Sequence, residues 1–193
     1  MTFKEQLIVT IVDKALIGIV VAIAGFWLNR YLESFKARRA LENELAKVRD
    51  QKKLQFLESQ LTEFYWPLYL RLQMDNAVWE QILQRKSKDP IKASIAQRIE
   101  NDFILPNHEA ACQIIQSKIH LGIDPAVIEV LLKYVRHVAV YRAIRASGNL
   151  ETDPMDVGER WPKAVFPLVE RATLDRQREF QAMLEQTGRS AGR

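Results

Sequence analysis

The hydrophobic pattern sets the N-terminal part of the chain apart from the rest. Residues 7–28, LIVTIVDKALIGIVVAIAGFWL, are apolar except for Thr10 and the adjacent Asp13 and Lys14. A helix rising about 1.5 Å per residue over this length covers a hydrocarbon core of about 30 Å. The run continues to Leu28 and then reaches Arg30, a stop-transfer ending. It therefore predicts one retained transmembrane helix, with a cleaved signal peptide and a buried core helix as the alternatives.

The next stretch predicts a long stalk helix. Residues 29–64 contain no Gly or Pro, and opposite charges three positions apart recur, for example Glu33 with Lys36 and Glu44 with Lys47. The apolar spacing slips in register between Val48 and Leu54, so a sustained coiled coil is not predicted.

The remainder of the chain reads as a bundle of shorter helices. Pro67 interrupts one helix, Asp89-Pro90 starts another, and Pro106 to Gly122 bounds a third. The helix from Pro125 to Gly148 is apolar on most sides and is expected at the centre, with a last helix over 168–186. The predicted fold class is all-α, with a transmembrane anchor (1–30), a stalk (31–63), a cytosolic bundle (64–187) and a flexible tail (188–193).

Charge around the apolar run predicts its orientation. Arg30, Lys36, Arg38 and Arg39 follow the run, whereas Lys4 before it is cancelled by Glu5. Basic residues near a span mark the cytoplasmic side, so the expected location is a single-pass protein of a bacterial inner membrane with its C-terminal domain in the cytoplasm. The net charge of +4 is assigned to attraction to anionic lipid and not to nucleic acid.

Small residues recur along one face of the apolar run, at Ala15, Gly18, Ala22, Gly25 and Asn29. Steps of three and four place them on one helix face, where small side chains let two helices approach closely. We call these five residues the small-residue seam. The alternative is the ordinary abundance of Gly and Ala in such helices.

Asp13 and Lys14 interrupt the run near its start. Charges at the centre of a bilayer cost about 2.5–3.5 kcal/mol, so one interpretation starts the hydrocarbon near Ala15 and lets Lys14 reach the interface. The other interpretation makes Asp13 and Lys14 a charged ring at the mouth of an oligomeric pore.

Aromatic residues cluster around Pro67. Phe64, Tyr65, Trp66 and Tyr69 surround the proline, where the helix must kink or restart. Filling of an irregular corner of the core is the favoured interpretation, and a surface that binds a partner is the alternative.

Catalytic, cofactor and metal motifs are absent from the sequence. It contains no GxxxxGK[ST], GxGxxG, GxSxG or HExxH pattern. His108 and Cys112 stand four apart on one predicted helix, too few ligands for zinc, and Cys112 is interpreted as structural. His120 and His137 are likewise interpreted as structural. No catalytic, cofactor-binding or metal-binding residue is predicted, and the protein is expected not to be an enzyme.

The FYWPLYLRLQ stretch, with the apolar run and the basic exit GFWLNRYLESFKARR, resembles the membrane accessory proteins of type VI CRISPR systems. That resemblance implies a HEPN-like helical bundle that assembles into a ring in the membrane, and a CRISPR effector or RNA as a further partner. HEPN ribonucleases carry an Arg five positions before a His, but Phe103, Ile115 and Leu132 stand before the three histidines. No catalytic residue carries over from that family.

Together these patterns predict a membrane-anchored homo-oligomer, with the lipid bilayer as a partner, that acts in antiviral defence by forming a pore or perturbing the membrane. A non-conducting membrane-tethered scaffold and an anchored ribonuclease with a degenerate site are the two alternatives.

Overall fold

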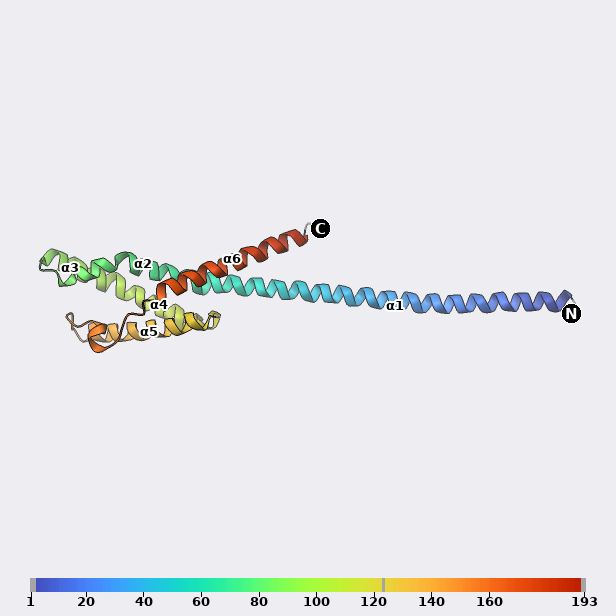
Figure 1. Ribbon diagram of the computed structural model, residues 1–193, viewed down its shortest axis with the longest axis horizontal. Coiled ribbons are helices and arrows are strands. Elements are labelled where there is room, and N and C mark those ends of the chain that lie inside the picture. The colour runs from blue at the N-terminus through green and yellow to red at the C-terminus, as the bar shows by residue number, and fades with distance from the viewer. Residues whose placement is uncertain (1–2, 123, 192–193) are drawn as a thin grey trace. The chain divides into compact units, whose positions relative to one another are not determined.

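The computed structural model describes residues 3–122 and 124–191, and every regular element in these two ranges is helical (Figure 1). The all-α prediction is confirmed. The elements are α1 (Phe3–Ser59), η1 (Gln60–Tyr65), α2 (Trp66–Leu83), η2 (Gln84–Lys86), α3 (Pro90–Ile99), η3 (Glu100–Ile104), α4 (Leu105–Lys118), η4 (Ile119–Leu121), α5 (Pro125–Ala146), η5 (Pro154–Val157) and α6 (Val165–Ala191). The chain divides into two compact units, Met1–Lys52 and Lys53–Arg193.

The predicted membrane span is not supported, and the predicted location in a bacterial inner membrane is wrong on this finding. Among the described residues, no helix combines the length with the apolar composition that crossing a bilayer demands. Beyond Leu28, α1 continues through the charged residues Arg30, Glu33 and Lys36. The apolar part of this helix therefore ends at Leu28. The side chains of Asp13, Lys14 and Ala15 lie outside the described residues, and the pore-mouth hypothesis remains without a structural test.

The first unit consists of one helix whose described side chains are almost all exposed. Gly18, Ala22, Gly25 and Asn29 of the small-residue seam are exposed, and no atom lies within 4 Å of a Cβ built at Gly18 or Gly25. Large apolar side chains are exposed as well: Val21, Ile23, Phe26, Trp27, Leu28, Tyr31, Leu32, Phe35, Leu41, Leu45 and Val48. The seam itself stays a prediction.

In the second unit, α2, α4, α5 and α6 form the helical bundle (Figure 1). Each of these helices packs against the next along the chain, and α6 returns to pack against α2. The expected central helix, α5, carries the fully buried side chains of Leu131 and Tyr134. Its burial follows from its sequence, which is apolar on most faces. The main core cluster is Phe64, Tyr65, Leu68, Leu72, Ala111, Cys112, Ile115, Leu121, Val127, Val130, Leu131, Tyr134, Val138, Val165 and Val169.

Two helix starts follow the capping signals of the sequence. Asp89 accepts a hydrogen bond from the backbone N–H of Ile91 at 3.0 Å, and Asp124 accepts one from Ala126 at 2.8 Å. A proline opens each helix, where its missing N–H costs nothing. At the other end of α5, Gly148 adopts φ 76°, a conformation that suits glycine at the end of a helix.

Two π-helical turns were not expected from the sequence. One of them, η1, buries the amide of Gln60, whose Nε2 donates to the carbonyl oxygen of Leu121 at 2.6 Å. The other, η3, joins α3 to α4 without a break and buries Glu100 completely. A π turn holds one residue more than an α turn, and such turns are frequent at functional sites.

The predicted aromatic corner divides between core and surface. Phe64 and Tyr65 are buried in the main core, whereas Trp66 is 41% exposed. Tyr69 stacks on Phe166 and donates its hydroxyl hydrogen to Glu170 at 3.2 Å. Pro67 directly follows the π turn η1, whose C-terminal neighbour Trp66 bonds back to the carbonyl of Leu61, so the chain stays helical through the proline.

Candidate functional site

A cavity of about 500 Å³ lies within the second unit, between α2, α4, α5, the start of α6 and the connection between α5 and α6 (residues 147–164). Its volume falls within the range of small-molecule sites. The lining residues are Leu72, Asp75, Asn76, Trp79, Ile82, Leu83, Arg85, Lys86, Ile104, His108, His137, Tyr141, Asp153, Pro154, Met155, Trp161, Lys163, Val165 and Phe166.

Trp161 organises the aromatic side of this cavity. It lies on the α5–α6 connection, and its ring stacks on that of Trp79 with centroids 6.3 Å apart. It also contacts the rings of His137 at 5.1 Å and His108 at 6.0 Å, measured between centroids. A side chain from the connection thus brings the two buried histidines and α2 together around one wall.

Asp75 and His108 form the polar part of the wall. Both are buried, at 7% and 3% exposure. Asp75 Oδ1 accepts a hydrogen bond from Asn107 Nδ2 at 2.6 Å. Asp75 Oδ2 lies 3.0 Å from His108 Nδ1, an ion-pair distance, but this contact is not a hydrogen bond, and Oδ2 has no other partner in the described part of the chain. One oxygen of a buried carboxylate is therefore open to a donor.

His108 Nδ1 has a second neighbour, the hydroxyl of Tyr134, at 2.7 Å. Burial raises the pKa of Tyr134 well above its ordinary value, so this hydroxyl keeps its proton. When Nδ1 of His108 carries the ring proton, that proton faces both the Tyr134 hydroxyl and Asp75. The contact with the Tyr134 hydroxyl holds the imidazole ring of His108 in its position in the cavity wall.

His137 presents a second open acceptor. It is 6% exposed, and its Nδ1 has no hydrogen-bond partner. Burial, and then the field of His108, lower the pKa of His137 below 6.5, although hydrogen bonding to the backbone of Glu159 and Arg160 opposes this shift. The ring is therefore neutral at pH 7. A neutral imidazole carries one ring proton and one lone pair, and with the proton on Nε2 the lone pair is on Nδ1.

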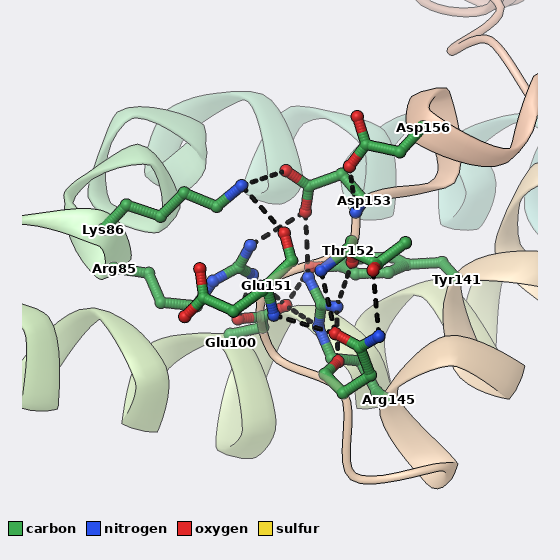
Figure 2. A network of polar contacts seen from close by, with 10 residues as sticks. Arg85, Lys86, Glu100, Tyr141, Arg145, Glu151, Thr152, Asp153 and Asp156 are labelled. Atoms are coloured by element: carbon green, nitrogen blue, oxygen red, sulfur yellow. Dashed lines mark hydrogen bonds and ion pairs between the residues drawn. The ribbon is translucent and has the colours of Figure 1, made fainter.

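An ion network (Figure 2) adjoins the cavity, because Arg85, Lys86, Tyr141 and Asp153 belong to the network and also line the cavity. Arg85 and Arg145 converge on Glu100: Arg145 Nε donates to Oε1 at 2.7 Å and Arg85 Nη1 at 2.6 Å. Both arginines also donate to Asp153 Oδ1, at 2.8 Å from Arg85 and 3.0 Å from Arg145. The Tyr141 hydroxyl donates to Glu100 as well. The network ties the α5–α6 connection to η2, η3 and α5.

The charges of this network are stabilised in their ionised forms. Burial alone would raise the pKa of Glu100, but the hydrogen bonds from Tyr141, Arg85 and Arg145 outweigh it and lower the pKa below 4.5. The pKa of Asp153 is lowered against its burial in the same way, by hydrogen bonds from Arg85, Lys86 and Arg145. Burial, followed by the bond to Glu100, raises the pKa of Tyr141. Arg85 Nε remains without a partner.

The residues considered from the sequence fall in different places. His108 and His137, both interpreted as structural, line the cavity, whereas Cys112 lies in the main core. Burial raises the pKa of the Cys112 thiol to about 11, which makes it a poor nucleophile. Asp75, Trp79 and Trp161 were not singled out as site residues. Asp75 and Trp79 are four apart on one helix, a spacing that places them on a common face.

Among the described residues, no group of three or more His, Cys, Asp and Glu side chains is arranged to hold a metal ion. In comparisons with known proteins, no family model, curated protein or solved structure matches this chain. The resemblance to CRISPR accessory proteins thus stays a prediction, and the argument on function rests on the cavity.

Proposed function

We propose that the second unit is a small-molecule-binding domain and that its ligand occupies the cavity beside Trp161. One observation carries this proposal: the lining combines mostly apolar and aromatic side chains with two buried atoms, Asp75 Oδ2 and His137 Nδ1, that accept no hydrogen bond from any described residue. Buried polar groups are almost always hydrogen-bonded in native proteins, and unpaired ones in a concave apolar site suit a ligand.

The surroundings support a preformed site. Trp161 is held between Trp79 and the rings of His108 and His137, so the wall is rigid. The network around Glu100 fixes the connection that carries Trp161. A preformed site loses little conformational freedom when the ligand binds.

Binding of 2-phenylethanol, a neutral aromatic probe, measured by isothermal titration calorimetry, tests this proposal. The wild-type protein should bind it, and Trp161→Ala should lose binding because the wall is removed. Trp66→Ala, which removes an exposed tryptophan that does not line the cavity, is the matched control. Circular dichroism verifies that both variants are folded. Equal binding by wild type and Trp161→Ala, or no binding by wild type, contradicts the proposal.

A second proposal concerns the first unit, whose bare apolar surface favours self-association. Large apolar side chains are exposed from Val21 to Val48, far more than a monomer normally leaves in water. The open space at Gly18 and Gly25 would let the helix of a second copy approach closely along the small-residue seam. We therefore propose that the protein forms a homo-oligomer through α1.

Sedimentation velocity of the full chain tests the oligomer. Gly18→Leu with Ala22→Leu should lower the sedimenting mass, because bulky side chains on the contact face separate the helices. Val21→Leu, an exposed apolar exchange beside the seam, should leave the mass unchanged. A monomeric wild type, or an unchanged mass in the double variant, overturns this proposal.

A further inference from the structure

We propose that the cavity takes an organic cation, a protonated amine on an aromatic or apolar body, with its ammonium group at Asp75. This inference rests on the proposed binding function and adds the chemical class of the ligand. It starts from two buried atoms of lining residues that accept no hydrogen bond within the described part of the chain: Asp75 Oδ2, whose near neighbour is His108 Nδ1 at 3.0 Å, and His137 Nδ1.

Both atoms are acceptors. Asp75 Oδ2 belongs to a carboxylate, and Nδ1 of the neutral His137 carries a lone pair. A carboxylate or phosphate group of a ligand would meet two further acceptors there and would be repelled. An ammonium group brings three donors, enough for both atoms, and its charge complements Asp75. The two residues lie at the same wall, because His137 and His108, the neighbour of Asp75, both contact Trp161.

The aromatic lining favours the same ligand. Trp79, Trp161, Tyr141 and Phe166 all line the cavity. Ring faces attract cations, tryptophan most strongly, and the effect increases when the cation is removed from water. The same rings also provide the apolar surface for the body of the ligand.

Two of the three cationic side chains of the lining are paired away from Asp75, and the third, Lys163, forms no ion pair among the described residues. Arg85 and Lys86 are paired with Asp153, and Arg85 is also paired with Glu100. Arg85 is ten residues beyond Asp75 on the chain, about 15 Å along a helix at 1.5 Å per residue. Its Nε is a donor that has no hydrogen-bond partner within the residues that the structure describes. That atom suits an acceptor on the distal part of the ligand, and it makes an anionic ligand the alternative to exclude.

Three probes of similar size separate these classes: 2-phenylethylamine, 2-phenylethanol and 3-phenylpropanoate, each titrated calorimetrically at neutral pH. The amine should bind at least about tenfold more tightly than the alcohol, the gain expected for a charge-assisted hydrogen bond. The carboxylate should bind most weakly. This comparison uses the wild-type protein alone and does not depend on the folding of any variant.

Asp75→Asn then tests the assigned residue. It should reduce amine affinity about tenfold, to the level of the alcohol, while leaving affinity for the alcohol nearly unchanged. Asp102→Asn is the matched control, because Asp102 is exposed and pairs with Arg98 outside the cavity. Retained alcohol binding by Asp75→Asn shows that the cavity is intact.

The outcomes distinguish this inference from the proposed function. Three results would contradict a cationic ligand: equal affinities for all three probes, tighter binding of the carboxylate, or an amine preference that remains in Asp75→Asn. None of them would contradict the proposal that the cavity binds a small molecule. Absence of binding for all three probes overturns both. An amine preference lost in Asp75→Asn and kept in Asp102→Asn supports the inference.

Discussion

Replacement of Glu100 by glutamine should strongly destabilise the second unit. The change keeps the size of the side chain and removes its charge, so Arg85 and Arg145 lose the anion that they share. These two side chains are only 8% and 5% exposed, and Glu100 is fully buried. Breaking a buried ion pair from one side costs about 3–5 kcal/mol, because an uncompensated charge stays buried. Asp153 remains, but it is 40% exposed and compensates only in part.

Urea unfolding followed by circular dichroism measures this loss. A domain of ordinary stability has about 5–15 kcal/mol of unfolding free energy, so a loss of about 3–5 kcal/mol would move the midpoint clearly. Asp102→Asn is again the control, because the Arg98–Asp102 pair is exposed and should contribute at most about 1 kcal/mol.

The result that refutes this reasoning is a loss below about 1 kcal/mol for Glu100→Gln, similar to the control. It would mean that solvent or Asp153 neutralises the two arginines. Glu100→Leu combined with Arg85→Met gives a further check. Apolar replacement of buried charges is often neutral or stabilising, so this pair should lose less stability than the sum of its single changes.

Three further predictions concern the core, a helix cap and a histidine. Leu131→Ala, at the fully buried centre of α5, should lower the unfolding free energy by about 2–5 kcal/mol in the same urea assay; a change near zero would place the centre of the core elsewhere. Asp124→Ala removes the N-cap of α5 and should lower the unfolding free energy by about 1 kcal/mol in the same assay, whereas Asp124→Asn retains a capping oxygen and should lower it much less. Because the pKa of His137 is lowered in the folded protein, this histidine takes up a proton near pH 6.5 in the unfolded chain and only at a lower pH in the folded protein. Stability should therefore fall as the pH decreases below 6.5, and His137→Gln should reduce this slope; an imidazole pKa at or above 6.5 by NMR would contradict the assignment.

Local features of the fold could be predicted because their causes are local in sequence. Asp124 and Pro125 are adjacent, and together they fix where α5 begins. The apolar faces of α5 indicated that it contributes buried side chains to the core, as Leu131 and Tyr134 do, although α5 is one of four helices around that core and packs mainly against α4 and α6 among them. The predicted span is the exception, because among the described residues no helix is long and apolar enough to cross a membrane.

The cavity could not be predicted because its residues are remote in sequence. Asp75 meets His108 across 33 positions, and Arg85 meets Asp153 across 68. No periodicity links such pairs. The interpretation of His137 as structural used only its position on one helix. The contact between its ring and that of Trp161 shows that the ring lies in a buried wall of the cavity. Trp161 lies in the α5–α6 connection, near Pro154 and Gly158. Nothing in the neighbouring sequence indicates that its ring contacts His137.

The π-helical turn η3 makes the spacing between α3 and α4 sensitive to chain length. Regular α-helix advances by 100° per residue, so the extra residue of a π turn offsets everything beyond it by that angle. Deletion of one residue in 100–104 would let α3 and α4 merge into one regular helix, but the side chains of α3 would then rotate by about 100° relative to His108. Related chains should therefore be able to exchange the exposed residues of this stretch, Asn101 and Asp102, but not to lose one. Conserved length, together with the buried Glu100, would mark the element that holds the cavity wall in register.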